Sequence, residues 1–262
     1  MEYEKLTLSN DFIFAKVMQN EELCKRLLEI ILDIRINRIV YHEEQKVIDD
    51  APDGKAVRLD VYVQDDENTV FDIEMQASDT KELPKRSRYY QGIVDLNTLR
   101  KGRRYSELRE SYIIFICTFD EFGYGKHVYS FENLCIENPS IRLEDKTHKV
   151  FICAEGTEED CSDKMKEFLN YISGKGSNGD FTRRLQEKVE RSKKEEKWRL
   201  EYMTLMDKLD EKYEEGYNDG EIKGREEGRE EGREEGREVR QALEDKIRCL
   251  EAENEQLKKQ LV

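Results

Sequence analysis

Two runs of alternating apolar and polar residues stand out in the first third of the chain. They cover residues 58–64 and 70–76, and a polar stretch from Asp65 to Asn68 lies between them. Their apolar members all have odd numbers: Leu59, Val61, Val63, Phe71, Ile73 and Met75. Successive side chains of a β-strand point to opposite faces, and two such runs around a polar turn are typical of a hairpin. The pattern therefore predicts two antiparallel strands whose odd residues cover one face of a sheet.

The even positions of the two runs share the opposite face, which carries two carboxylates. With a five-residue loop, Asp60 lies directly opposite Glu74, and with a four-residue loop it lies one step away. In either register the two carboxylates project from the same side of neighbouring strands, within reach of a shared cation.

Converging carboxylates repel each other unless a proton or a metal ion compensates their charge. Hard oxygen ligands of this kind suit Mg²⁺ or Mn²⁺, which retain several waters and bind phosphate oxygens. A metal so placed can activate water and stabilise a leaving phosphodiester oxygen. The alternative interpretation is a polar, solvated strand face on which Asp60 and Glu74 have no role, because such alternation is common in antiparallel sheets.

The order of residues around this hairpin resembles a known nuclease motif. Asp60 followed by Glu74-x-Gln76 is similar to the PD-(D/E)XK motif in its D…ExQ variant, and the likeness to the PD-(D/E)XK nuclease family transposases, or recombination-promoting nucleases, spans about 5–215. It is carried by Asn10-Asp11-Phe12-x-Phe14, Asp72-Ile-Glu-Met-Gln76, Arg88-Tyr-Tyr-Gln91 and Phe119-Asp-x-Phe-Gly123. The resemblance implies a restriction-endonuclease-like α/β fold and a Mg²⁺- or Mn²⁺-dependent endodeoxyribonuclease.

The resemblance also implies roles for single residues. Asp60 and Glu74 are expected to hold the metal ion, and Gln76 occupies the position of the motif lysine as a third catalytic residue. Lysine can orient or deprotonate the attacking water, whereas a neutral glutamine can only form hydrogen bonds. An acidic residue on a helix before the sheet sometimes joins such a site. Glu29 is the one candidate for that role, and the alternative, which we favour, is that its side chain is solvated.

At least one residue of the group Arg88-Tyr-Tyr-Gln91, on the helix after the hairpin, is expected to face the same site. Arg88, Tyr90 and Gln91 are the candidates for binding a DNA phosphate. The alternative is that a tyrosine packs in the core and the arginine is solvated.

Periodicity elsewhere predicts the remaining elements. Helices are predicted over 9–19 with Ser9 as N-cap, 21–32, 82–99 and 160–172, and further strands over 38–47, 112–119, 128–131 and 149–153.

The charge of the chain is negative, which restricts where DNA can bind. The net charge is −15 over 262 residues. Positive charge is concentrated in residues 81–109, with nine cations against three anions. Within this basic segment we expect a cluster to contact DNA phosphates: Arg100, Lys101, Arg103 and Arg104. The alternative is that the cluster only keeps the protein in solution.

Composition indicates where the protein resides. Mean hydropathy is −0.90 and no run of eighteen apolar residues occurs, so no membrane span is expected. The first residues lack the apolar segment of a signal peptide. Six cysteines without a C-x-x-C pair are typical of reduced thiols and not of a zinc site. We therefore expect a cytoplasmic protein.

The chain changes character near residue 173. We predict a nuclease-like domain over 1–173, a linker over 174–180 and a charged helical region over 181–242. In that region glycine recurs every fourth residue from Gly216 to Gly236. The glycines indicate either a stripe that allows close helix approach or a frayed, charged spacer.

Residues 243–262 show a heptad pattern of mostly apolar positions. The spacing alternates between four and three residues through Leu243, Ile247, Leu250, Asn254, Leu257 and Leu261. Leucine at d with one asparagine at a predicts a parallel two-stranded coiled coil and hence a homodimer.

These observations lead to two hypotheses for function. The first is a metal-dependent DNA endonuclease acting in recombination or mobile-element biology, as the resemblance implies. The second is a catalytically inactive, nuclease-like module that binds DNA or protein and forms oligomers, because Gln76 replaces the motif lysine.

Overall fold

The structure is a computed structural model that describes residues 3–48, 57–176 and 178–260. The chain divides into two compact units, Met1–Leu200 and Glu201–Val262, which we call the folded unit and the tail.

The first helix of the folded unit, α1 (Asp11–Met18), begins one residue later than its predicted cap implies. The side chain of Asn10 accepts a hydrogen bond from the Ile13 N–H at 3.2 Å and so caps the first turn. The prediction of Ser9 as N-cap is therefore wrong. The Ser9 hydroxyl instead donates to the carbonyl of Ile172 at 2.5 Å.

The other helices of the folded unit lie within a few residues of their predicted ranges. They are α2 (Glu21–Leu32), α3 (Leu83–Thr98), α4 (Asp163–Ile172) and α5 (Asp180–Lys193), with 3-10 turns η1 (Tyr3–Lys5) and η2 (Tyr105–Glu107). Helix α3 carries Pro84 in its first turn, where the missing N–H costs nothing. Helix α4 begins at Asp163 and not at 160, because Ser162 caps it.

One mixed sheet forms the centre of the folded unit. Its strands are β1 (Ile39–Ile48), β2 (Val57–Asp65), β3 (Val70–Gln76), β4 (Ser111–Cys117), β5 (Val128–Phe131) and β6 (Thr147–Cys153), in the order β1-β2-β3-β4-β6-β5. The pairs β3–β4 and β4–β6 are parallel, and the other three are antiparallel. The sequence therefore predicted that each of these six segments contains a strand, and β5 lies at one edge of the sheet.

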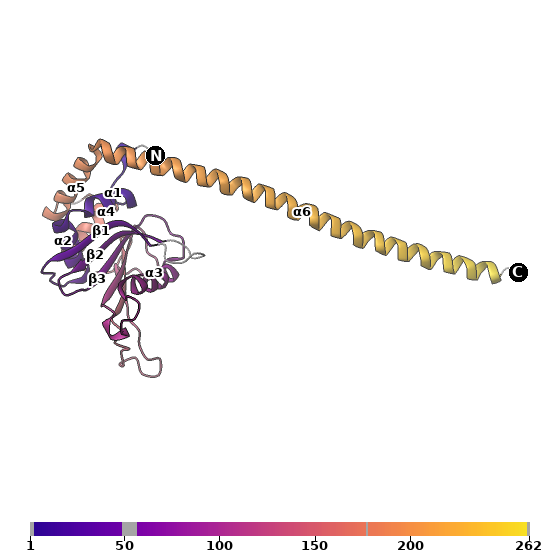
Figure 1. Cartoon of the computed structure of the whole chain (residues 1–262), viewed down its shortest axis with the longest axis horizontal. Helices are drawn as coiled ribbons and strands as arrows, with labels where there is room; N and C mark the ends of the chain where they lie inside the picture. The colour runs from indigo at the N-terminus through magenta and orange to yellow at the C-terminus, as the bar shows by residue number, and fades with distance from the viewer. Residues whose placement is uncertain (1–2, 49–56, 177, 261–262) are drawn as a thin grey trace. The chain divides into compact units, whose positions relative to one another are not determined.

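Helices lie on both faces of the sheet (Figure 1), and the central strands β3 and β4 are buried along almost their whole length. Helices α1, α2 and α4 lie on one side and α3 lies on the other. The α3 side contains a core in which Leu83, Tyr90 and Val94 pack with Phe115 and Phe151 of the sheet. This is the side toward which the even residues of β3 point, so α3 covers the face that carries the carboxylates.

The folded unit extends further along the chain than the predicted nuclease-like domain, which ended at 173. Helix α5 contacts α1 and α4, and its residues Leu185 and Val189 are buried. Residues 174–180, predicted as an interdomain linker, thus connect two helices of the same unit. The sequence missed this because the apolar residues of α5 are few.

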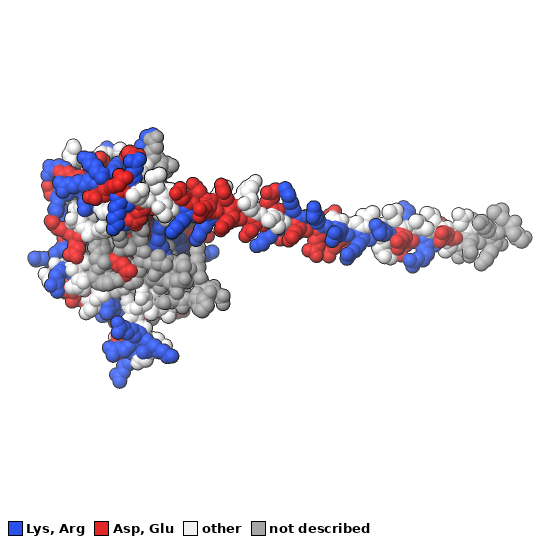
Figure 2. Space-filling view, turned by 45° about the horizontal axis from the view of Figure 1, so that its top comes forward, with Lys and Arg blue, Asp and Glu red and all other residues white. Residues whose placement is uncertain are grey.

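The tail contains most of one long helix, α6 (Glu196–Gln260), which begins within the folded unit. Basic and acidic side chains are interspersed along this helix (Figure 2), and its residues from 207 to 254 are exposed. A Cβ added at any glycine from Gly216 to Gly236 would meet no atom within 4 Å, so the helix itself leaves room there. The coiled coil stays a prediction, and part of its seam, Leu261, lies outside the described residues.

Within the described part of the chain, no helix combines the length and the apolarity that a membrane span needs.

Candidate active site

The hairpin brings the two predicted metal ligands together. Strands β2 and β3 pair from Gln64 with Val70 to Val61 with Ile73, which leaves the five-residue loop 65–69. This register, continued by one pair, places Asp60 opposite Glu74. The five-residue alternative is therefore confirmed.

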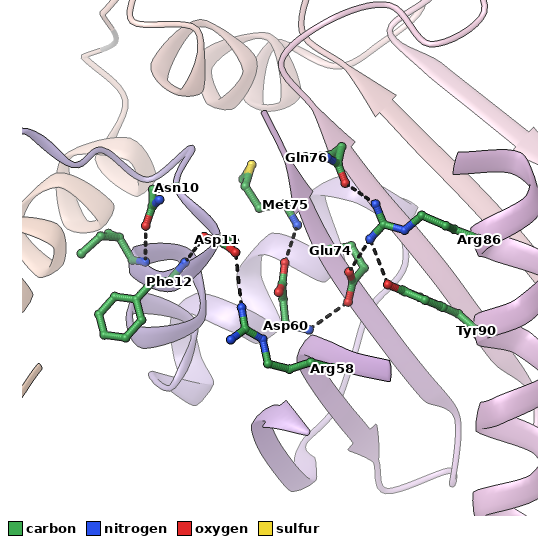
Figure 3. A network of polar contacts seen from close by, with 11 residues as sticks. Asn10, Asp11, Phe12, Arg58, Asp60, Glu74, Met75, Gln76, Arg86 and Tyr90 are labelled. Carbon is green, nitrogen blue, oxygen red and sulfur yellow. Dashed lines mark hydrogen bonds and ion pairs between the residues drawn. The ribbon is translucent and has the colours of Figure 1, made fainter. Parts of the chain in front are cut away.

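The backbone pairing of β2 with β3 ends at Val61 and Ile73. Beyond this point the carboxylates of Asp60 and Glu74, in place of main-chain carbonyls, accept the backbone hydrogen bonds. The Asp60 N–H donates to Glu74 Oε1 at 2.8 Å, and the Met75 N–H donates to Asp60 Oδ2 at 3.1 Å (Figure 3). Each carboxylate thus has one oxygen fixed by the backbone of the other strand. Among the described residues nothing donates to Asp60 Oδ1, and Glu74 Oε2 makes one long contact of 3.5 Å with Arg86. Both side chains are held in place with an oxygen left for another ligand.

This face of the hairpin is buried, which the sequence did not predict. Asp60 is 6% exposed and Glu74 is 3% exposed, and Asp72, two residues before Glu74 on β3, is fully buried. The interpretation of a solvated polar face is therefore wrong, because α3 covers these strands. The two oxygens of Asp72 have no hydrogen-bond partner among the described residues.

Burial and mutual repulsion alter how these groups titrate. Burial raises the pKa of Asp60 well above its ordinary value, and the charges of Glu74 and Asp11 raise it further. Burial also raises the pKa values of Glu74 and Asp72, with repulsion from Asp72 and Asp60 respectively as the next cause. Without a metal ion the cluster therefore retains protons at pH values where ordinary carboxyl groups are ionised.

A polar cavity of about 400 Å³ opens beside the carboxylates. Residues from four elements and the segments next to them line it: Ser9, Asn10, Asp11, Arg58, Asp60, Glu74, Met75, Gln76, Ala77, Ser78 and Arg86. The beginning of α1, the start of β2, the end of β3 and the first turns of α3 thus meet at one place.

The acidic residue that a preceding helix contributes is Asp11 and not Glu29. Asp11 lies at the start of α1, lines the cavity and forms an ion pair with Arg58 at 3.5 Å. Glu29 lies elsewhere on α2, where it accepts from the Ile36 N–H and pairs with Arg26. Glu29 is therefore not part of this site. The N-capping Asn10 before Asp11 was the signal available in the sequence, since it places the next residue at a helix N-terminus.

The residues on α3 divide between the site and the rest of the unit. Tyr90 packs in the core under α3, and its hydroxyl accepts a hydrogen bond from Arg86, which lines the cavity. Burial together with the nearby Glu74 charge raises the pKa of Tyr90 to about 12. Arg88 is exposed and does not line the cavity. Gln91 donates to Ser111 at 2.8 Å, at the end of the sheet away from Gln76. The structure therefore brings only Tyr90 of these three candidates to the carboxylates.

Arg86, on the same helix, lines the cavity although the sequence did not single it out. Its Nη1 donates to Gln76 Oε1 at 2.7 Å, and its Nη2 donates to the Tyr90 hydroxyl at 2.9 Å. The spacing Arg86-x-x-x-Tyr90 places both side chains on one helix face, and this was the signal that could have revealed it.

The basic cluster Arg100, Lys101, Arg103 and Arg104 is exposed but lies away from the cavity. It follows the C-terminal end of α3, whereas Arg86 lies near the N-terminal end. Helix geometry gives about 18 Å between Arg86 and Thr98 along the axis. These four cations are therefore not part of the carboxylate site.

The residues at the site fit a divalent cation that keeps several of its waters better than one enclosed by protein ligands. Among the described residues, no group of three or more His, Cys, Asp or Glu side chains could enclose a metal ion. Mg²⁺ normally keeps several waters and uses one or two carboxylates. Asp60 and Glu74, with fixed side chains and an open cavity beside them, supply such a set.

An α/β unit with paired carboxylates at the end of a central hairpin has the arrangement of a PD-(D/E)XK nuclease. The model of the PD-(D/E)XK nuclease family transposases matches residues 8–218, most of the chain. The protein belongs to this family, whose members form part of a nuclease superfamily. No curated protein and no solved structure matches the chain.

Proposed function

We propose that the protein is a metal-dependent endonuclease that hydrolyses phosphodiester bonds of DNA in recombination or mobile-element biology. The observation that carries this proposal is the pair Asp60 and Glu74. Each side chain is anchored by a backbone N–H of the opposite strand, and both line one polar cavity. Family membership supports the reaction class.

Asp60 and Glu74 would hold Mg²⁺ or Mn²⁺ through their remaining oxygens, with Asp11 at the edge of the same cavity. A bound divalent cation lowers the pKa of its water and stabilises charge on the leaving oxygen. In hydrolysis the water oxygen bonds to phosphorus, the bond from phosphorus to the leaving oxygen breaks, and one proton of the water ends on that oxygen. The buried carboxylates keep their geometry during this exchange because the backbone holds them.

The experiment that tests the proposal is cleavage of supercoiled DNA by the full chain with Mg²⁺ or Mn²⁺, and with EDTA as control. Nicked or linear product that needs the metal supports the endonuclease. Binding of DNA without product under all tested metals would favour the inactive binding module.

We infer that the basic cluster at 100–104 contacts DNA phosphates outside the cavity. Replacing Arg100, Lys101, Arg103 and Arg104 by glutamine should weaken binding to all DNA sequences alike. It should also lower the slope of log affinity against log salt by about 0.9 for each lost phosphate contact. A salt titration of binding measures this slope.

The control for this variant removes four cations elsewhere. Arg225, Arg229, Arg233 and Arg237 on the exposed tail helix, changed to glutamine, give the same change in net charge. An equal loss of slope in both variants would show that the cluster at 100–104 makes no particular contact.

We further propose that the tail pairs with the tail of a second copy. Leu243, Ile247 and Leu250 are each more than half exposed in the single chain. Pairing would bury them in a coiled-coil seam and bring two catalytic units to one DNA. Light scattering should give a dimer for the full chain and a monomer for the double variant Leu243→Lys, Leu250→Lys.

The matched control places lysines on the outer side of the same helix. Asp245 and Ala252 occupy outward f positions of the heptad, and their replacement by lysine should leave the dimer intact. Equal masses for the full chain and the seam variant would remove the coiled coil from the proposal.

A further inference from the structure

The side chain of Gln76 faces Arg86 in one orientation only. Its Nε2 donates to the carbonyl oxygen of Ser78 at 3.1 Å, and its Oε1 accepts from Arg86 Nη1 at 2.7 Å. A carbonyl cannot donate and a guanidinium cannot accept, so the amide cannot be turned round. The side-chain oxygen of Gln76 therefore accepts from Arg86, and the hydrogen bonds of this amide hold the guanidinium in place.

Arg86 is held from several sides at the wall of the cavity. Besides Gln76, it donates to the Tyr90 hydroxyl at 2.9 Å (Figure 3). Its guanidinium carbon lies 5.3 Å from the ring centre of Tyr90 and 5.4 Å from that of Phe115. A guanidinium group has five N–H donors, and these contacts with the one to Glu74 use three. The side chain keeps 29% of its surface exposed, so donors remain for a ligand in the cavity.

The contacts do not fit a simple counter-ion for Glu74. The distance from Arg86 Nη2 to Glu74 Oε2 is 3.5 Å, whereas the distance from Nη1 to the neutral Gln76 is 2.7 Å. A guanidinium whose role was to neutralise Glu74 would make its shortest and bidentate contact there. The observed geometry instead fixes the group beside the carboxylate and leaves its charge directed at the cavity.

We propose that Arg86 binds the scissile phosphate and supplies the positive charge that lysine supplies at the motif position in other nucleases of this class, with Gln76 as its positioning residue. This inference rests on the proposed nuclease function. Arg86 donates hydrogen bonds to non-bridging phosphate oxygens, stabilises their developing charge and exchanges no proton. Guanidinium suits this role because its planar fork matches a phosphate group and it stays charged at every working pH.

The proposal makes residues 76 and 86 a matched pair. Lysine at position 76 would place an ammonium group within hydrogen-bond distance of the guanidinium, and repulsion would displace both. A restored motif lysine is therefore harmful while Arg86 is present, and useful once Arg86 is gone.

The test compares the variants Arg86→Gln, Gln76→Lys and the double exchange Gln76→Lys, Arg86→Gln. Loss of one donor to a transition-state charge costs about 10²–10³ in kcat. Each single variant should lose that factor with a smaller change in KM, and the double exchange should recover at least about tenfold of it, which a merely structural role would not produce. Arg183→Gln is the control and should match the wild type, because this exposed arginine of α5 pairs with Asp180 alone among the described residues.

A second measurement does not depend on cleavage. In protein carrying Asp60→Asn, the affinity for a short DNA duplex is titrated with salt, with and without Arg86→Gln. One lost phosphate contact should lower the salt slope by about 0.9. Melting temperatures of all variants identify any that fail to fold.

The outcomes separate this inference from the proposed function. If the wild type cleaves DNA under none of the conditions, the proposed nuclease activity is overturned. The salt dependence of DNA binding then still decides whether Arg86 contacts a phosphate. An unchanged slope, or kcat of Arg86→Gln equal to that of the wild type, overturns the role of Arg86. A gain of activity in Gln76→Lys alone overturns the matched pair.

Discussion

Asparagine in place of Asp60 is expected to lower the rate of Mg²⁺-dependent DNA cleavage by about a thousandfold while the unit stays folded. A metal ion contributes several kcal/mol to transition-state stabilisation, and about 4 kcal/mol corresponds to that factor. The asparagine carbonyl can still accept the Met75 N–H, so the backbone keeps its partner. Alanine would leave that buried donor unsatisfied and confuse loss of the ligand with loss of the fold.

Glu74→Gln should have the same effect for the same reason, because the amide oxygen can still accept the Asp60 N–H. Cleavage rate and melting temperature are measured together. Glu29→Gln is the matched control, since Glu29 is an acid on α2 that lies outside the cavity. Cleavage by the double variant Asp60→Asn, Glu74→Gln at the wild-type rate would place the active site elsewhere.

The metal-free folded unit is expected to lose stability as pH rises, and Mg²⁺ is expected to restore it. Burial raises the pKa values of Asp60, Asp72 and Glu74, so the folded state binds protons more tightly than the unfolded state. The stability from these groups is therefore present below the ordinary values of 3.8 and 4.5, and it falls as pH rises from there through the raised pKa values.

The measurement is the melting temperature against pH for the wild type and for Asp60→Asn, Glu74→Gln. The wild type should fall relative to the variant as pH increases, because the variant has lost two of the titrating groups. At a metal concentration of 100 times Kd, binding adds about 2.7 kcal/mol. This should raise the melting temperature of the wild type by roughly 5–10 °C and leave the variant unchanged. Parallel curves with no effect of Mg²⁺ on the wild type would contradict both the buried charge and the metal site.

Local pattern was enough to predict most of the sheet. The alternation in residues 58–64 and 70–76 fixed which residues share a face, and the continuous apolar run near Ile114 indicated a strand covered on both sides. Helix α2 has the predicted ends, because its apolar period and its start after Asn20 agree. Such signals depend on near neighbours in the chain.

The environment of the site depends on contacts between distant residues, and the sequence did not show it. The carboxylates are buried because α3 covers their face of the sheet. The alternation of apolar and polar residues in 58–76 contains no information about that helix. Arg86 and Asp11 approach Glu74 and Asp60 only through the packing of two helices against the sheet. The basic cluster at 100–104 was predicted from its charge to contact DNA phosphates, and the charge pattern did not show that it follows the end of α3 opposite to Arg86.

The crossed hydrogen bonds at the end of the hairpin give the two acidic side chains a further role, as spacers. The shorter side chain of Asp60 reaches the amide of Met75, and the longer one of Glu74 reaches the amide of Asp60. The distance between β2 and β3 at this point therefore suits a side chain with one methylene group at position 60 and one with two methylene groups at position 74. The order of aspartate on the first strand and glutamate on the second is consequently a matter of reach as well as of charge.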